Sequence, residues 1–333
     1  MKKILKKIYS GEYLSEIESY TLFHNIFYKK LNDIQIAAVL AILSARSETY
    51  EEILGARKLV IQHIKNFPKP SYCVVDIVGT GGDQKNSFNI STVSAIVAAC
   101  YGIKIAKMCN VGSFHNLGSA NLLKKLNFNL EIPVKQAIYS LDKYNVCFLL
   151  ANFYLDHFKN VSKVRSLLKT KTIFNILGPL LNPIQPKHAL IGVYKIELML
   201  IYAKILATLK YKRAIIVHSG GMDEATLHAN THVVELNNNN VTEYILSPED
   251  FGLQKCPKKY ILNKTSEENY LETIKLFQGS GEKTYVRTIA INVSLLMKVL
   301  GSENLRENTL NILEFIKTGK IYDFVLQLSR LYQ

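Results

Sequence analysis

The stretch at residues 76–92, DIVGTGGDQKNSFNIST, constrains the fold of this chain more than any other. It overlaps an apolar run at 73–78, whose length and β-branched side chains predict a buried strand. Three glycines within four positions then allow a sharp turn and a close approach of the backbone to a ligand. Residues 93–101 predict a helix of small and apolar side chains, capped by Ser91 or Thr92. Strand, glycine turn and helix N-terminus together predict an anion-binding cradle.

Two common nucleotide-binding motifs are excluded for this stretch. No Gly-Lys-Ser/Thr follows the glycines, so it is not a Walker loop, and Gln84 stands where the third glycine of GxGxxG belongs. A purely structural glycine turn is the alternative interpretation. Asp83 directly after the glycines, and Asn-x-Ser-Thr at 89–92, favour a ligand-binding role over that alternative.

A second glycine turn follows a later strand. Residues 188–193 and 213–218 predict strands joined by a helix at 196–209, which indicates a parallel sheet. The second strand leads into SGGMDE at 219–224, and ligands collect at the carboxyl edge of such sheets. The adjacent acids Asp223 and Glu224 predict a site of hard oxygen ligands for Mg²⁺, although an isolated acidic pair is more often solvated surface.

The N-terminal part of the chain has a different pattern. Residues 1–66 predict helices, and Pro68 and Pro70 interrupt the pattern that follows. The fold class that we predict is α/β, with a central, mostly parallel sheet flanked by helices, plus a smaller all-helical N-terminal domain. The predicted domain boundaries are 1–68 for the helical domain and 70–333 for the α/β catalytic domain.

Composition excludes some classes of protein. A hydrophobic content of 48% supports a packed core, and no apolar run reaches the length of a membrane span. The basic N-terminus does not predict a signal peptide, because Lys6 and Lys7 interrupt its apolar part and no cleavage site follows. The five cysteines form no CxxC pair, which predicts reduced thiols and a cytoplasmic location.

The formal net charge of +14 raises the question of nucleic-acid binding. The chain has 34 Lys and 7 Arg, spread along the sequence, whereas nucleic-acid readers usually depend on Arg. A basic surface also gathers a polyanionic small substrate. The charge therefore does not separate a nucleic-acid binder from an enzyme.

The motifs at 76–83 and 89–92, D-x-x-GTGGD and N-x-S-T, resemble the phosphoribosyl diphosphate loop of the anthranilate phosphoribosyltransferases. The segment VRSLLKTKTIFNILGPLLNP at 164–183 and the acidic pair at 223–224 are also similar to that family, and the resemblance covers nearly the whole chain. It implies a pentosyltransferase that moves the 5-phosphoribosyl group from phosphoribosyl diphosphate to anthranilate. The products would be N-(5-phosphoribosyl)anthranilate and diphosphate, in the second step of tryptophan synthesis from chorismate.

The resemblance implies three sets of site residues. Those expected at phosphoribosyl diphosphate are Gly79, Gly82, Asp83, Ser87, Asn89, Ile90, Ser91, Thr92, Lys107 and Ser119. Those expected at anthranilate are Gly79, Asn110, Arg165, Gly178 and Pro179. Those expected at magnesium, with two ions when substrate is bound, are Ser91, Asp223 and Glu224. Lys107, Asn110 and Arg165 would act by electrostatics and positioning, because the sequence offers no evident general base.

The loop after the second predicted strand departs from the family pattern. Met108, Cys109 and Val111 stand where His, Gly and Arg are usual, Phe114 and His115 replace two serines, and Asn121 replaces an acid. Asn152 and Leu155 replace a Pro and a His further on. We interpret Met108 and Phe114 as packing residues and His115 as a solvent-exposed loop residue.

These departures leave three alternatives open. They are a fold relative that binds nucleic acid, a pyrimidine nucleoside phosphorylase and a weakened enzyme. By resemblance we expect small-molecule substrates and a homodimer joined through the helical domain, which part of residues 160–185 would complete. We expect neither nucleic acid nor a membrane as a partner.

Overall fold

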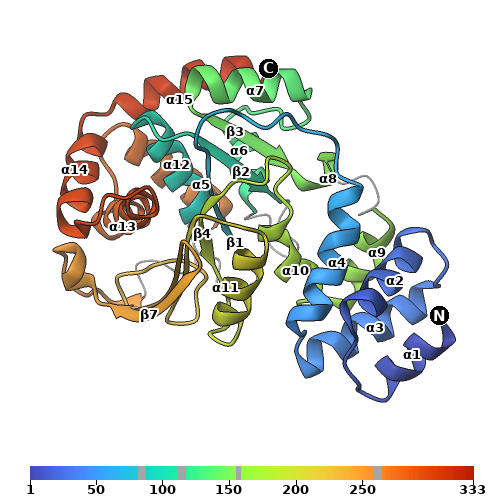
Figure 1. Cartoon of the computed structure of the whole chain (residues 1–333). Helices are drawn as coiled ribbons and strands as arrows, with labels where there is room; N and C mark the ends of the chain where they lie inside the picture. The colour runs from blue at the N-terminus through green and yellow to red at the C-terminus, as the bar shows by residue number, and fades with distance from the viewer. Residues whose placement is uncertain (82–87, 111–117, 155–158, 259–264) are drawn as a thin grey trace. The chain divides into compact units, whose positions relative to one another are not determined.

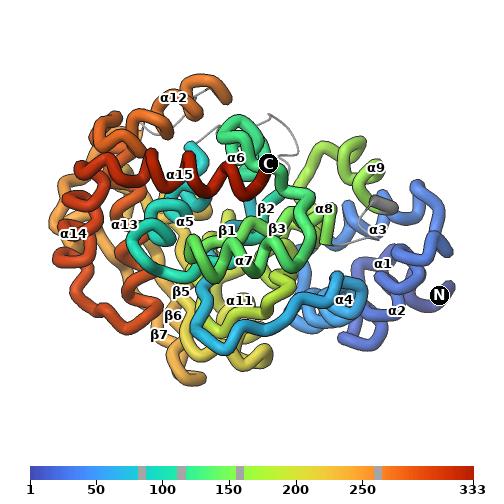
Figure 2. The backbone as a smooth tube through the Cα atoms, turned by 90° about the horizontal axis from the view of Figure 1, so that it is seen from above, coloured from blue at the N-terminus to red at the C-terminus, as the bar shows by residue number. Residues whose placement is uncertain are grey.

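The computed structural model describes residues 1–81, 88–110, 118–154, 159–258 and 265–333 (Figure 1). The chain forms two compact units. Unit 1 contains residues 1–68 and 151–185, and unit 2 contains residues 69–150 and 186–333. Figure 2 shows the same path as a backbone tube.

Unit 1 is helical in its described residues. Its N-terminal helices are α1 (Lys2–Tyr9), α2 (Glu16–Phe27), α3 (Asp33–Arg46) and α4 (Tyr50–Gln62). The later segment adds α8 (Ala151–Tyr154), α9 (Lys159–Leu168), α10 (Ile173–Leu177) and the 3₁₀ turn η2 (Gly178–Leu180). Phe23 of α2 meets Phe174 of α10 edge to face, with ring centroids 5.8 Å apart. The two stretches of sequence therefore share one core.

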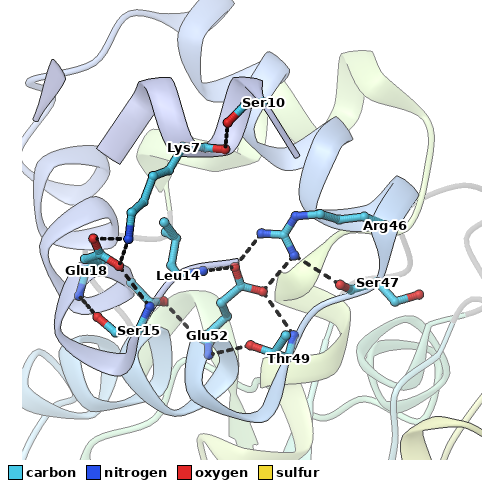
Figure 3. Close-up of polar contacts among 10 residues, drawn as sticks. Lys7, Ser10, Leu14, Ser15, Glu18, Arg46, Ser47, Thr49 and Glu52 are labelled. Carbon is cyan, nitrogen blue, oxygen red and sulfur yellow. Dashed lines mark hydrogen bonds and ion pairs between the residues drawn. The ribbon is translucent and has the colours of Figure 1, made fainter. Parts of the chain in front are cut away.

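Capping residues explain where the first helices begin. Ser15, Asn32 and Thr49 each form a capping box with the residue three positions later, before α2, α3 and α4. The third box belongs to a buried polar centre at Glu52 (Figure 3). The carboxylate of Glu52 accepts hydrogen bonds from the backbone N–H groups of Leu14 and Thr49 and from the guanidinium of Arg46. This ion pair ties the α1–α2 connection and the α3–α4 connection to one point.

Unit 2 is built on a seven-stranded sheet in the order β3-β2-β1-β4-β5-β6-β7. Its strands are β1 (Val75–Gly79), β2 (Ile105–Cys109), β3 (Val146–Leu150), β4 (His188–Gly192), β5 (Arg213–Ser219), β6 (Thr231–Asn237) and β7 (Asn240–Leu246). The pairings from β3 to β5 are parallel, and β6 and β7 are antiparallel. The predicted fold class, a mostly parallel sheet flanked by helices with a smaller helical domain, is confirmed.

Helices and a 3₁₀ turn accompany the sheet. They are α5 (Ile90–Cys100), α6 (Ser119–Lys125), α7 (Val134–Tyr144), α11 (Leu198–Thr208), η3 (Pro248–Phe251), α12 (Ser266–Phe277), α13 (Lys283–Val299), α14 (Leu305–Lys317) and α15 (Lys320–Leu331). Helix α5 contacts β1 and β2 and also α13, so nearly all of its side chains are buried. Its small and apolar sequence suits this position between strands and a second helix.

The strand register brings the strand ends to one edge. Gly79 pairs with Gly192, Gly192 with Val217, and Cys109 with Leu150. The carboxyl ends of the five parallel strands therefore lie side by side. Ligands of open α/β sheets bind at this edge.

The prediction that Ser91 or Thr92 caps α5 was wrong. The helix begins at Ile90 with Asn89 at the N-cap position, and no side chain within the described residues caps it. The Asn89 carbonyl accepts the first helical hydrogen bond, 3.0 Å from Val93 N. Ser91 and Thr92 consequently lie inside the first turn of the helix, where their hydroxyls are not needed as caps.

Candidate active site

The glycine turn after β1 is held against the neighbouring strand. The N–H of Thr80 donates to the Gly192 carbonyl at 3.0 Å, and the Thr80 hydroxyl accepts from Tyr194 N at 3.1 Å. Gly81 has φ +65°, a left-handed conformation that favours glycine. Its N–H donates to Asp223 Oδ2 at 2.7 Å. The turn is thus tied to both β4 and the acidic pair.

A second glycine turn delivers Asp223 to the same place. Ser219 and Met222 exchange backbone hydrogen bonds of 3.1 and 2.9 Å, and both glycines between them have positive φ. This tight turn brings Asp223 back over the strand ends, where its side chain is buried. The backbone at Gly79 and Gly192 leaves the space that Asp223 occupies. An added Cβ at Gly79 would lie 2.2 Å from Asp223 Oδ2, and one at Gly192 would lie 1.5 Å from the Asp223 carbonyl oxygen.

Lys107 places a buried amino group near these acids. Only 2% of Lys107 is exposed, and its Nζ donates to the Ile77 carbonyl at 2.7 Å and to Ser91 Oγ at 3.1 Å. Burial lowers the pKa of Lys107, and the nearby carboxylates of Asp76, Glu224 and Asp223 oppose that shift. Strand β2, helix α5 and the acidic pair therefore contribute to one charged cluster.

Asn110 and Ser119 face each other across the loop that follows β2. The N–H of Asn110 donates to Ser119 Oγ at 3.1 Å, and Ser119 Oγ lies 3.3 Å from the Asn110 carbonyl. Neighbouring Cys109 is buried, and burial raises the pKa of its thiol to about 11. Cys109 is therefore a neutral packing residue at neutral pH, and Met108 is likewise buried.

Several predicted site residues lie elsewhere or outside the described part of the chain. Ile90 and Thr92 are buried in α5, and Asn89 accepts a hydrogen bond of 2.9 Å from Asn269 of α12. The residues that fall outside the described ranges are Gly82, Asp83, Ser87, Val111, Phe114, His115 and Leu155.

Unit 1 carries the remaining predicted residues. Arg165 lies on α9, with its guanidinium carbon 5.4 Å from the centre of the Phe174 ring. Burial lowers the pKa of Arg165 to about 10, so the group remains charged at neutral pH. Gly178 and Pro179 begin η2, directly after the helix that carries Phe174. Arg165, Gly178 and Pro179 thus belong to unit 1, whereas Gly79 and Asn110 belong to unit 2.

Three residues near this site escaped the sequence analysis. Gly192 makes room for Asp223, Asn269 contacts Asn89, and Asn292 of α13 contacts Ala225 next to the acidic pair. Gly192 was detectable in the sequence as a glycine near the end of a predicted strand. The structure pairs it with Gly79 in a parallel register. The two asparagines lie on helices, in segments where the sequence showed no motif.

The oxygen donors at the strand ends fit a magnesium ion. Two adjacent carboxylates and the Ser91 hydroxyl are hard ligands, and Mg²⁺ commonly takes one or two carboxylates plus substrate phosphates and water. Across the described ranges, no group of three or more His, Cys, Asp and Glu side chains could form a complete protein cage.

Comparison with known proteins defines the class first. Residues 71–322 match the a/b domain of the glycosyl transferase family, and residues 2–64 match its helical bundle domain. The chain is therefore a member of this glycosyl transferase family. In the described residues, no helix is both long and apolar enough to cross a membrane.

Full-length relatives narrow this class to one enzyme family. The chain is 49% identical to anthranilate phosphoribosyltransferase of Buchnera aphidicola subsp. Baizongia pistaciae, over 99% of this chain and 100% of the relative. It is 46% identical to that of the subspecies Schizaphis graminum, over 99% of both chains. The chain belongs to the anthranilate phosphoribosyltransferases, so the resemblance seen in the sequence is confirmed.

Solved structures agree with this assignment. Anthranilate phosphoribosyltransferase (TrpD) from Thermus thermophilus superposes with a TM-score of 0.90 at 29% identity, covering 99% of both chains. The enzyme from Saccharomyces cerevisiae in complex with PRPP and Mg gives 0.89 at 26% identity, covering 99% of this chain and 97% of that one. The same yeast enzyme in complex with 4-fluoroanthranilate gives 0.86 at 26% identity, with the same coverage.

Proposed function

We propose that this chain transfers the 5-phosphoribosyl group from phosphoribosyl diphosphate to the amine of anthranilate, releasing diphosphate. The cluster of Lys107, Ser91 and Asp223 with the glycine turn at 79–81 is the observation that carries the proposal. It combines the buried Lys107 with the buried Asp223, which fills the space left by Gly79 and Gly192 at the edge of a parallel sheet. Such an edge can accept a diphosphate together with a divalent ion.

Phosphoribosyl diphosphate would bind along this edge and the start of α5. We assign its contacts to Gly79, Gly82, Asp83, Ser87, Asn89, Ile90, Ser91, Thr92, Lys107 and Ser119. The first turn of an α-helix presents backbone N–H groups that no helical carbonyl accepts, together with the positive end of the helix dipole, and both favour a phosphate. The ammonium group of Lys107 adds a positive charge whose place is fixed by Ile77 and Ser91.

Magnesium is the cofactor of the proposal, with Ser91, Asp223 and Glu224 as its protein ligands. When bound, it would neutralise the charge that develops on the departing diphosphate. The hydrogen bond from Gly81 holds the carboxylate of Asp223, so the acid needs no reorganisation when substrate arrives. The yeast relative was solved with PRPP and Mg, which supports the use of this metal, and two ions are our proposal for the substrate complex.

Anthranilate would be held by Gly79, Asn110, Arg165, Gly178 and Pro179. The planar guanidinium of Arg165 suits a carboxylate, because it can donate two parallel hydrogen bonds. Its place over the Phe174 ring restricts the orientation of the fork. Arg165 and Asn110 would orient the amine for attack on the ribose carbon, a positioning role that requires no proton acceptor from the protein.

The larger organisation is part of the same proposal. The helical unit, residues 1–68 completed by residues 151–185, and the α/β unit would act as the two domains. A homodimer through the helical domain is part of the proposal, and exposed apolar side chains on α1 to α3, among them Tyr9, Ile17 and Ile34, would be available to it. A cytoplasmic location agrees with the five free cysteines.

The other functions considered from the sequence are not favoured. The relatives and neighbours described above are named anthranilate phosphoribosyltransferases, and none is named a nucleic-acid binder or a nucleoside phosphorylase. The test of the proposal is the consumption of fluorescent anthranilate with phosphoribosyl diphosphate and Mg²⁺. Turnover that requires all three components supports it, and the absence of turnover would reject it.

A further inference from the structure

We propose that Asn292 of α13 is a positioning residue for the acidic pair Asp223–Glu224, acting through the backbone of Ala225. The inference rests on the proposed function, because it assigns a role to the metal ligands named there. Within the described residues, the hydrogen bonds of Asn292 go to Ala225 and Thr288. None goes to a carboxylate of the acidic pair or to a residue assigned to a substrate.

The contacts of Asn292 concentrate on one residue. Its Oδ1 accepts from Ala225 N at 3.3 Å, and its Nδ2 donates to the Ala225 carbonyl at 2.9 Å. Nδ2 also donates to the Thr288 carbonyl, 2.8 Å away and one helical turn earlier. Asn292 is only 2% exposed and Ala225 is fully buried. The side chain is thus fixed to its own helix and holds both backbone groups of Ala225.

This contact constrains Glu224 because the peptide bond is planar. The N–H of Ala225 lies in the same rigid plane as the carbonyl of Glu224. Holding that N–H therefore fixes the plane on the carboxyl side of Glu224. The backbone direction from which the Glu224 side chain departs follows from this plane.

The residue on the other side of Glu224 is also held. Asp223 packs against Gly79 and Gly192 and accepts the hydrogen bond from Gly81. Glu224 consequently lies between two fixed neighbours, one anchored by the sheet edge and one by α13. Helix α13 also contacts β4 and β5. Asn292 therefore lies on a helix that packs against the strand preceding the acidic pair.

Removing the side-chain amide of Asn292 would change the orientation of the acidic pair more than the structure of α13. A buried backbone N–H and carbonyl at Ala225 would lose their partner, and buried polar groups without partners are strongly disfavoured. The Glu224–Ala225 peptide would then turn toward another partner or toward water. Groups that orient metal ligands in this way commonly change metal affinity roughly 10- to 100-fold when they are replaced.

The experiment compares Asn292→Leu with a matched control, Asn308→Leu. Asn308 lies on α14, is also 2% exposed, donates to the Ser302 carbonyl at 2.8 Å and accepts from Ser302 Oγ at 2.6 Å. It is a buried asparagine of the same kind, and its contacts shown in the described residues lie away from the acidic segment. Both variants and the wild type are titrated with Mn²⁺ in the presence of inorganic diphosphate, with free Mn²⁺ followed by electron paramagnetic resonance. Thermal unfolding of each protein is recorded alongside.

The expected result is a roughly 10-fold or larger rise in the Mn²⁺ dissociation constant for Asn292→Leu and no change for Asn308→Leu. Both variants should lose thermal stability. Asn292→Asp keeps an acceptor for Ala225 N but places a carboxylate oxygen against the carbonyls of Ala225 and Thr288, so it should also raise the Mn²⁺ dissociation constant. If Asn292→Leu does not fold, the Mn²⁺ affinity of Asn292→Asp tests whether Asn292 positions the acidic pair.

Two results would overturn the inference. Wild-type Mn²⁺ affinity in the folded Asn292 variants would show that the acids do not depend on this anchor, and equal weakening in Asn308→Leu would show a general loss of stability. Either result leaves the proposed function intact. If the wild-type protein itself binds no Mn²⁺ with diphosphate, the metal site of the proposed function fails and the inference fails with it.

Discussion

The carboxylate of Asp223 accepts a 2.7 Å hydrogen bond from the backbone N–H of Gly81, across 142 positions of sequence. This contact joins the two glycine turns of the chain at one edge of the sheet. It also explains why glycines border the acid, because a side chain on either β1 or β4 at this level would meet Asp223. The shape of the candidate site therefore depends on how closely these turns approach each other.

Asn89 depends on a partner from α12, so Asn269→Ala should weaken the binding of phosphoribosyl diphosphate. Asn269 Nδ2 donates to Asn89 Oδ1 at 2.9 Å, which turns the amide N–H₂ of Asn89 away from α12. Loss of this contact removes one constraint on the orientation of the Asn89 side chain. We expect the KM for phosphoribosyl diphosphate to rise about 5- to 10-fold, since one net hydrogen bond contributes about 1 kcal/mol. The KM for anthranilate should stay constant in steady-state assays, and a rise in both constants would contradict this role.

Gly192→Ala should displace Asp223 and strongly lower activity. The new Cβ would lie 1.5 Å from the Asp223 carbonyl oxygen, a backbone atom that cannot rotate away. Displacing the segment by about 1 Å should lower kcat/KM by about 10²-fold or more, and overpacking should cost about 3 kcal/mol of unfolding free energy. Activity and chemical denaturation of the purified variant check both effects.

The control for this variant is Gly102→Ala. Gly102 has φ +111°, and within the described residues no atom lies closer than 4 Å to an added Cβ. Backbone strain of about 1–2 kcal/mol should lower its stability while kcat/KM remains near the wild-type value. If both glycine variants lose activity equally, crowding at Asp223 is not the cause.

Arg165→Lys should raise the KM for anthranilate by about 10-fold or more, because an ammonium cannot replace a two-pronged guanidinium on a carboxylate. The KM for phosphoribosyl diphosphate should change little. Lys163→Ala on the same helix is the matched control, since Lys163 is exposed and makes a surface ion pair with Asp33 at 3.4 Å. Unchanged anthranilate affinity in Arg165→Lys would remove Arg165 from the site.

Glu303 should make the stability of the protein depend on pH in the acid range. Hydrogen bonds from Arg213 and Lys298 lower the pKa of Glu303 from its ordinary 4.5 to about 2, against a smaller opposing effect of burial. Because the folded-state pKa is the lower one, the stabilisation is present above pH 4.5 and is lost as the pH falls toward 2. Glu303 is partly exposed, so the contribution is about 0.5–1 kcal/mol.

The measurement for Glu303 is urea unfolding of wild type and Glu303→Gln from about pH 6 to the lowest pH at which both remain folded. The wild type should be more stable at the upper end, and the difference should shrink as the pH falls below the ordinary glutamate pKa of 4.5. A constant difference across this range would mean that the charge of Glu303 does not contribute.

The sequence was sufficient for the sheet edge and its two glycine turns. Local signals determine these features: apolar runs with β-branched residues become strands, and glycines mark where the backbone reverses. The end of β1 at Gly79 and the turn after β5 that leads to Asp223 therefore followed from pattern alone, and so did the mostly parallel sheet. The family motif then suggested Lys107, whose contact with Ser91 the structure shows.

Other features depended on tertiary contacts that no local pattern contains. Asn292 reaches Ala225 across 67 positions and Asn269 reaches Asn89 across 180, so neither asparagine is distinguishable in sequence from an ordinary helix residue. The cap of α5 was mispredicted because Asn89, Ser91 and Thr92 are all residue types that can cap a helix. The sequence did not show which one precedes the first helical residue, which is Ile90. The roles of individual site residues remain predictions for the experiments above.

The most direct test of the central claim is phosphoribosyl transfer by wild type and by the double variant Asp223→Asn/Glu224→Gln, followed as loss of anthranilate fluorescence over a range of Mg²⁺ concentrations. We predict Mg²⁺-dependent turnover in the wild type. In the double variant we predict a loss of at least about 10²-fold, with thermal stability retained. Full turnover by the double variant at the same Mg²⁺ concentrations would contradict the claim that these two acids hold the metal.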